Sequence, residues 1–187
     1  MSFFKTKPHE KIGQARINVK DQSSGYGTNI IIKTVRLPDG VIEKFFVTDD
    51  SDSVQIFAIT HMNEVIMVRQ WRPGNESEGL ELPGGGLEKG EDPLDAAERE
   101  LVEETMFSAG RMEYLGSCPY SPYSNGRRHM FFARDCVRTE KHLDLDDNEH
   151  LQVVKMPLDI FVAKIKESPA SIRGWDLALL ALNKFGY

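Results

Sequence analysis

Cysteine is scarce in this chain, which has only Cys118 and Cys136 and no Cys-x-x-Cys pair. We therefore expect two free thiols in a reducing compartment rather than a disulfide framework. Long hydrophobic runs are lacking too. No stretch approaches the length of a membrane span, and residues 1–16 contain no signal-peptide hydrophobic region. These absences predict a cytoplasmic protein with no membrane partner.

Basic charge is in deficit, because 23 Lys and Arg face 29 Asp and Glu, for a net charge of −6. That balance argues against a broad nucleic-acid surface, and no basic stretch with interleaved aromatic residues is present. The chain contains no internal repeat and no low-complexity segment. Its 187 residues, 40% of them hydrophobic, suit one globular domain with a smaller arm. An anionic substrate would need cations or local arginines in order to bind.

The N-terminal part reads as a small β subdomain. Residues 1–14 look like a loose leader, and Ala15–Asp49 has strand chemistry broken by a turn signal at Leu37–Gly40. A polar cluster then interrupts the pattern, so we place the domain boundary between residues 1–50 and 51–187. The first segment is too small to bury much surface alone. It must pack on the main domain or on a second subunit.

The rest of the chain alternates between strands and helices, which predicts an α/β fold with a mixed sheet and helices on both faces. Within the last predicted helix, Trp175, Leu179 and Leu182 are candidate core residues. The predicted strands are 54–60, 64–71, 79–83, 112–118, 129–136 and 151–156, and the predicted helices are 93–106, 157–167 and 170–185.

The first of these helices concentrates acidic residues. Asp92 suits the N-cap and Pro93 the first turn. At 100° per residue, Leu94, Ala97 and Leu101 share one face, while Glu100, Glu103 and Glu104 share another. Three carboxylates so spaced repel one another, and they lie near the helix C-terminus, where the helix dipole disfavours anions.

A bound divalent cation would offset the repulsion among these three carboxylates, because it attracts all of them. Mg²⁺ prefers oxygen ligands, and the glycines 84–86 let a backbone carbonyl approach an ion closely. Arg99 is the one cation in the cluster and can hold a glutamate in place. The alternative is a solvated acidic face with ordinary pairing, but an acid-rich patch beside three glycines favours a metal site.

A series of set spacings joins the glycines to the helix: Gly85, five residues, Glu91, seven residues, then Arg99-Glu100-Leu101-Val102-Glu103-Glu104. This pattern resembles the Nudix box, Gly-x5-Glu-x7-Arg-Glu-aliphatic-x-Glu-Glu-x-Gly-aliphatic. The chain departs from it at the last glycine, where Met106 stands. A glycine there would normally end the helix in the left-handed conformation, so the departure concerns the helix end and no metal ligand.

The resemblance implies a Nudix α/β/α sandwich and the following roles. Glu100 and Glu104 would bind Mg²⁺, with Mn²⁺ as the alternative, and the Gly84 carbonyl would contribute. Glu103 would serve a second ion or polarise water. Glu91 and Gly85 would be structural, since Glu91 would pair with Arg99 to hold the loop against the helix. Activated water would attack one phosphorus of a diphosphate.

Further motifs resemble the branch that hydrolyses ADP-ribose and nucleoside diphosphate sugars: Val35–Gly40, Val68–Pro73, Glu81–Pro83 and Ser121–Tyr123. This branch implies a homodimer built through the N-terminal antiparallel β arm. It also implies that Arg72 contacts the substrate phosphates and that Pro122 lies in the substrate site. Trp71 is either a core residue or a surface on which a base stacks.

The general base would come from Glu149 or Asp147, outside the box, with Glu103 and Arg99 completing the candidate catalytic residues. Arg127 stands where the branch often has an acid, which suggests a more anionic substrate or another leaving group. His129 reads as structural.

Two alternatives stay open: a Nudix hydrolase of dinucleotides, nucleoside triphosphates or RNA 5′ ends, and a non-catalytic nucleotide sensor. The base and the sugar are left undefined.

Overall fold

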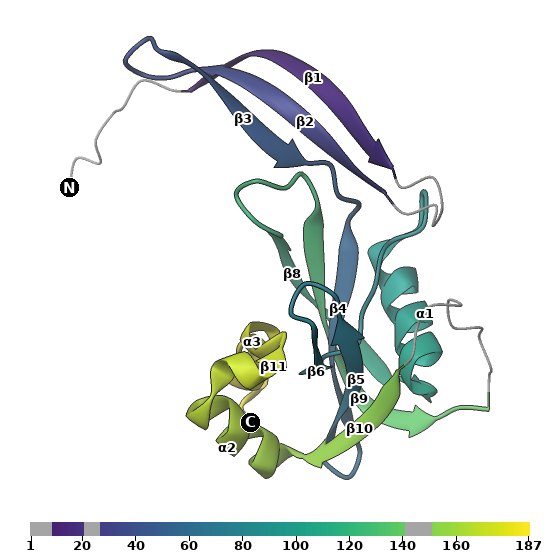
Figure 1. Cartoon of the computed structure of the whole chain (residues 1–187). Helices are drawn as coiled ribbons and strands as arrows, with labels where there is room; N and C mark the ends of the chain where they lie inside the picture. The colour runs from purple at the N-terminus through teal and green to yellow at the C-terminus, as the bar shows by residue number, and fades with distance from the viewer. Residues whose placement is uncertain (1–8, 21–26, 141–150) are drawn as a thin grey trace. The chain divides into compact units, whose positions relative to one another are not determined.

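A computed structural model describes residues 9–20, 27–140 and 151–187 (Figure 1). The chain divides into two compact units, Met1–Ser51 with Pro119–Arg127, and Asp52–Cys118 with Arg128–Tyr187. The segment Pro119–Arg127 belongs to the first unit although it lies far beyond residue 50 in the sequence. The functional role of residues 1–50 stays a prediction.

The first unit contains a three-stranded antiparallel sheet in the order β1 (Glu10–Lys20), β2 (Gly27–Arg36), β3 (Ile42–Thr48). The predicted turn joins β2 to β3, and the Gly40 N–H donates to the Leu37 carbonyl at 2.9 Å. The prediction of a loose leader was wrong from Glu10 onward. Glu10 pairs with Arg36, so backbone pairing with β2 extends a segment whose polar side chains do not signal a strand.

The second unit is built on an eight-stranded mixed sheet, whose main path runs β11-β6-β5-β4-β9-β7, with β10 beside β5 and β8 beside β9. The pairs β4–β9 and β11–β6 are parallel, and β4–β5 and β5–β6 are antiparallel. The strands are β4 (Ser53–Thr60), β5 (Glu64–Arg72), β6 (Ser77–Glu81), β7 (Phe107–Ser108), β8 (Arg111–Pro119), β9 (Arg127–Arg138), β10 (Gln152–Pro157) and β11 (Ile172–Arg173).

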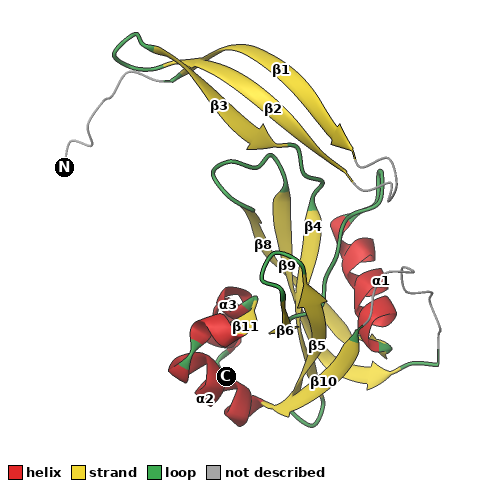
Figure 2. Ribbon diagram, in the orientation of Figure 1, coloured by secondary structure: helices red, strands yellow, loops and turns green. Residues whose placement is uncertain are grey.

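Helices cover both faces of this sheet, which confirms the predicted α/β/α arrangement (Figure 2). Strand β4 has no solvent face, because successive side chains of a strand point to opposite sides and both sides are buried here. Its residues Ile56 and Ala58 pack with helix α1 (Pro93–Thr105). Its residues Phe57 and Ile59 pack with α2 (Leu158–Glu167) and α3 (Trp175–Phe185).

The C-terminal segment differs from the single helix predicted over 170–185. A 3₁₀ turn at Pro169–Ser171 and strand β11 come first, and Gly174, with a φ of 91°, turns the chain into α3. The buried face of α3 consequently carries Leu177, Ala178, Ala181 and Leu182. The burial predicted for Leu182 is confirmed, but Trp175 and Leu179 are exposed.

Helix α1 begins and ends close to the predicted positions. Asp92 is its N-cap and accepts a hydrogen bond from the Leu94 N–H at 2.8 Å. Ala97 and Leu101 are fully buried against the sheet, as predicted. Leu94 was predicted on the same buried face, but it is exposed, because it lies in the first turn beyond the edge of the packed surface.

Both cysteines are free thiols in the described part of the chain, as expected. Burial raises the pKa of the Cys136 thiol to about 12, so this side chain behaves as an apolar core residue. Across residues 9–20, 27–140 and 151–187, none of the helices is long and apolar enough to cross a bilayer.

Candidate active site

The glycine loop, residues 83–87, runs along the beginning of β4 and is held there by backbone hydrogen bonds. The Val54 N–H donates to the Gly85 carbonyl at 2.9 Å, and the Leu87 N–H donates to the Asp52 carbonyl at 2.9 Å. Gly84 has a φ of 152°, and a Cβ there would clash with the Val54 carbonyl oxygen and lie 2.9 Å from Gln55 Cα. Only glycine fits this approach of loop to strand.

Two glutamates of α1 turn toward the glycine loop. Glu104 Oε2 accepts a hydrogen bond from the Gly84 N–H at 2.8 Å. The Glu100 carboxylate lies directly over Gly85, where a Cβ would approach its Cδ to 2.5 Å. Glu100 is 9% exposed and Glu104 is 5% exposed. Nearly buried carboxylates require compensation by hydrogen bonds or cations, and here the Gly84 N–H donates to Glu104 and Arg99 pairs with Glu100.

Arg99 ties the loop to the helix. Its Nε and Nη2 groups donate to the two oxygens of Glu91 at 2.8 and 2.9 Å, and Nη2 also donates to the Gly86 carbonyl at 3.1 Å. Its Nη1 group donates to Glu100 Oε1 at 2.9 Å and to Glu103 Oε2 at 2.7 Å. The structure therefore places Glu91 and Arg99 together, in the arrangement that the sequence resemblance implied.

These contacts shift the pKa values of Glu91 and Arg99 in opposite directions. Hydrogen bonding to Arg99 lowers the pKa of Glu91 below its ordinary value, and a hydrogen bond from the Glu88 N–H adds to the effect. Hydrogen bonding to Glu91 raises the pKa of Arg99. Both groups consequently stay charged at neutral pH, and the loop remains clamped to the helix.

The donor set fits a hard divalent cation. Carboxylate and carbonyl oxygens are the ligands that Mg²⁺ and Mn²⁺ prefer, and Mg²⁺ usually takes one or two carboxylates and completes its shell with water and phosphate oxygens. Glu100 and Glu104 supply two such carboxylates. In the part of the chain that the structure describes, no group of three or more His, Cys, Asp or Glu side chains is arranged to hold a metal ion.

Arg72 lies on the face of β5 that also carries Gln70. Its guanidinium makes a two-pronged ion pair with Glu81, with Nε–Oε1 at 2.9 Å and Nη2–Oε2 at 2.8 Å. Arg173 Nη1 lies 3.6 Å from the same carboxylate. The neighbouring Trp71 is 55% exposed, so of its two predicted alternatives the core position is wrong: its face of β5 is covered at Val65 and Met67 but not at Trp71.

The other predicted site residues are distributed as follows. Pro122 and Arg127 are exposed and belong to the first unit, whereas Glu100 and Glu104 belong to the second. Asp147 and Glu149, the predicted sources of the general base, lie outside the described residues. His129 Nε2 lies 3.2 Å from Asp52 Oδ2, and its Nδ1 lies 3.4 Å from the Tyr114 hydroxyl.

Sequence reasoning did not assign roles to Glu81 or Arg173. A pattern signal existed for Glu81, because it stands directly before the Leu82-Pro83-Gly84 segment. None existed for Arg173, because the segment around it was read as helix. Its contact with Glu81 depends on the parallel pairing of β11 with β6, which places Arg173 opposite Glu81.

The α/β/α sandwich, with a glycine loop set against nearly buried helix carboxylates, is the arrangement that the resemblance to Nudix hydrolases implied. Residues 50–175 match the family model of the NUDIX domain. A methanol dehydrogenase activator of Bacillus methanolicus is 35% identical over 145 residues, 77% of this chain and 78% of that protein. An ADP-ribose pyrophosphatase of Bacillus subtilis (strain 168) is 32% identical over 137 residues, 73% of this chain and 74% of that protein.

A solved structure of an ADP compounds hydrolase shares the fold, with a TM-score of 0.78 at 20% sequence identity, over 98% of this chain and 99% of that chain. The chain belongs to the Nudix family of pyrophosphohydrolases, whose enzymes generally use a divalent metal ion.

Proposed function

We propose that this chain hydrolyses the diphosphate bond of ADP-ribose or of a related nucleoside diphosphate sugar, releasing a nucleoside monophosphate and a sugar phosphate. The observation that carries the proposal is the pair of nearly buried carboxylates, Glu100 and Glu104, set against the loop at Gly84 and Gly85. The relative that is named an ADP-ribose pyrophosphatase supports this substrate class.

We assign the metal ligands to Glu100 and Glu104, with the Gly84 carbonyl as a third donor and Glu103 for a second ion. Mg²⁺ is the proposed ion and Mn²⁺ the alternative. When bound, such an ion supplies charge neutralisation and an acidified water. The chain contributes the geometry. Arg99 holds Glu100 and Glu103 in place, and Arg72, which Glu81 holds through its Nε and Nη2 groups, is the proposed contact for the substrate phosphates.

We assign the general base to Glu149 or Asp147, with Glu103 as the alternative within the box. Trp71, whose ring is exposed, is the proposed stacking surface for a base. Pro122 and Arg127 stay proposed substrate contacts.

The substrate is tested by incubating the protein with ADP-ribose, GDP-mannose, UDP-glucose, NADH, diadenosine tetraphosphate and deoxynucleoside triphosphates, each with Mg²⁺ or Mn²⁺, and separating the products by chromatography. We expect the diphosphate sugars to be cleaved fastest. Activity confined to triphosphates or to dinucleotides would overturn the substrate assignment and leave the fold unaffected.

The metal site is tested with Glu104→Gln, which keeps the hydrogen bond to the Gly84 N–H but removes the charge. We expect turnover to fall by about two to three orders of magnitude, as for the loss of one charge-stabilising group. Glu98→Gln is the matched control, because Glu98 is an exposed acid on the same helix. A nucleotide sensor would behave differently, since Glu104→Gln would then leave nucleotide affinity nearly intact and no hydrolysis would be seen in the native protein.

We also propose a homodimer formed through the N-terminal sheet. The sheet of β1, β2 and β3 exposes several large apolar side chains, and unpaired apolar surface of this kind is typical of an interaction site. They are Ile12, Ile17, Ile42 and Phe46.

A further inference from the structure

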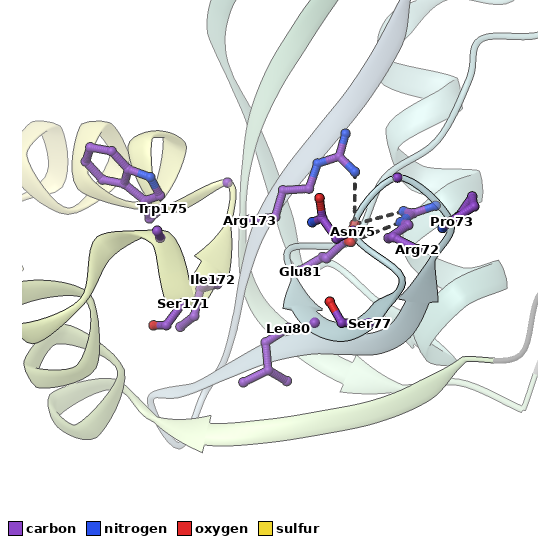
Figure 3. Close-up of a pocket in the computed structure, with 14 residues that line it drawn as sticks. Arg72, Pro73, Asn75, Ser77, Leu80, Glu81, Ser171, Ile172, Arg173 and Trp175 are labelled. Atoms are coloured by element: carbon purple, nitrogen blue, oxygen red, sulfur yellow. Dashed lines mark hydrogen bonds and ion pairs between the residues drawn. The ribbon is translucent and has the colours of Figure 1, made fainter.

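A pocket of about 680 Å³ opens between the end of β5, the loop to β6 and the segment that leads into α3 (Figure 3). All of its lining residues belong to the second unit. The charged residues among them are Arg72, Arg173 and Glu81. Two guanidinium groups and one carboxylate leave an excess positive charge, in a chain whose net charge is −6. The volume lies within the range of small-molecule sites.

The three charged side chains converge in the pocket (Figure 3). The Glu81 side chain is 8% exposed, and each of its two carboxylate oxygens accepts a hydrogen bond from Arg72. The Gln70 amide lies 3.5 Å from Glu81 Oε2. Arg173 meets the same oxygen at 3.6 Å, beyond the usual length of a hydrogen bond. Its guanidinium can therefore turn to a ligand with little loss in this ion pair.

The backbone holds Arg173 at this position. Strand β11 pairs with β6 so that Arg173 lies opposite Glu81, and the Leu82 N–H donates to the Arg173 carbonyl at 3.0 Å. Gly174 follows with a φ of 91°, and a Cβ there would come within 2.7 Å of the Gln55 amide nitrogen. A tight turn on one side and a strand pair on the other thus aim the side chain, which is 65% exposed, over the pocket.

We propose that Arg173 is a second arginine for the substrate phosphates, acting beside Arg72 in this pocket. Glu81 is the positioning residue that holds the two guanidinium groups near each other. Only Leu82 separates Glu81 from the glycine loop, so β6, which carries Glu81, leads directly into the loop at the proposed cleavage site. Paired guanidinium forks match phosphate oxygens in charge and in geometry. This inference rests on the proposed function and deepens it.

The test uses the full chain and inorganic pyrophosphate as probe, with EDTA present so that no metal contributes to binding. Binding is measured by calorimetry for the native protein, for Arg173→Gln and for Arg69→Gln. Arg69 is the matched control, because it is an exposed arginine on the other face of β5. We expect Arg173→Gln to weaken pyrophosphate binding about tenfold and Arg69→Gln to leave it unchanged. Equal affinity of Arg173→Gln and the native protein would overturn the proposal.

Kinetics give the second measurement. Because Arg173 binds the substrate and does not carry the reaction, Arg173→Gln should raise KM about tenfold and change kcat by less than about threefold. If Arg173→Gln melts at a lower temperature than the native protein, Arg173→Lys is used in its place. An Arg173→Lys variant that melts at the native temperature but binds pyrophosphate more weakly supports the role of the guanidinium fork.

The two proposals fail separately. If ADP-ribose and its relatives are not cleaved but pyrophosphate binding still depends on Arg173, the substrate assignment is wrong and the arginine assignment stands. If ADP-ribose is cleaved and Arg173→Gln has a native KM, the arginine assignment is wrong and the proposed function stands.

Discussion

Met106 ends helix α1 in the left-handed conformation, with φ of 62° and ψ of 25°. The Nudix box places a glycine at this position, and the backbone adopts the glycine conformation even though the side chain differs. The Met106 N–H still donates to the Val102 carbonyl at 2.9 Å. The departure from the box therefore leaves the end of the helix intact and introduces strain at one residue.

Replacing this residue should stabilise the protein. Left-handed backbone costs a side-chain-bearing residue roughly 1–2 kcal/mol, so Met106→Gly should raise the free energy of unfolding by about 1 kcal/mol after the loss of side-chain contacts. In a chain of this size the melting temperature would rise by about 2–4 °C. Met106→Ala is the control, because alanine keeps the strain and should give no gain. A lower melting temperature for Met106→Gly would show that methionine packing outweighs the strain.

At the scale of single residues, the pairing of Glu91 with Arg99 was predictable and the exposure of Trp71 was not. Glu91 and Arg99 were expected to pair because the box sets their spacing, and the structure brings them together. Trp71 could be read either way. Its exposure depends on which face of β5 it occupies and on where the elements packed on that face end. The local sequence does not encode this packing.

At the scale of an element, the three glycines before α1 are not equivalent. A Cβ at Gly84 would strike the backbone of β4, a Cβ at Gly85 would strike the Glu100 carboxylate, and a Cβ at Gly86 would meet nothing within 4 Å. The strand backbone beside Gly84 cannot move aside, whereas the carboxylate beside Gly85 can. The space beside Gly86 is empty, so a Cβ there requires no movement. The loop therefore contains one glycine required by the backbone of β4 and one required by the side chain of Glu100.

Alanine substitutions along the loop should reproduce this order. Gly84→Ala should lower the free energy of unfolding by about 2–3 kcal/mol, as expected for overpacking against fixed atoms. Gly85→Ala should cost less stability but should lower turnover by about two orders of magnitude, because Glu100 must leave its position. Gly86→Ala is the internal control and should change stability by less than about 0.5 kcal/mol.

Thermal unfolding and steady-state kinetics on the same three variants check this prediction. Equal loss of stability in all three would mean that the loop tolerates no Cβ at any position. Full activity of Gly85→Ala would mean that the position of Glu100 over the loop is unimportant for turnover.

Elements with strong local signals were predicted closely. Asp92 and Pro93 mark the start of α1, and the short apolar runs of β4 and β5 coincide with the strands predicted over 54–60 and 64–71. The segment Ala170–Arg173 was misread because its apolar residues fit a helix as well as a strand. The choice is made by tertiary pairing of β11 with β6, which a single sequence does not reveal.

At the scale of the whole molecule, the proposed dimer makes a prediction about strand β3. Phe46 is 61% exposed, and alternation places the exposed Glu43 on the opposite face of the strand. If the face with Phe46 is covered by a second copy of the chain, Phe46→Glu should convert a dimer to a monomer in sedimentation experiments at micromolar concentration. Glu43→Lys, a charge change on the opposite face of the same strand, should disturb association less. A native protein that sediments as a monomer would contradict the dimer.

Strand β4 links the glycine loop to the helices on the far side of the sheet. Its backbone receives the loop through Val54 and Ile56, whose N–H groups donate to Gly85 and Pro83 at 2.9 and 2.8 Å, and its Phe57 ring stacks on Phe132 in the opposite core. A change of side-chain volume beneath α2 or α3 would thus displace the strand to which the loop is anchored. We therefore expect substitutions in the core beneath the C-terminal helices to alter turnover, even where the side chain lies far from the glycine loop.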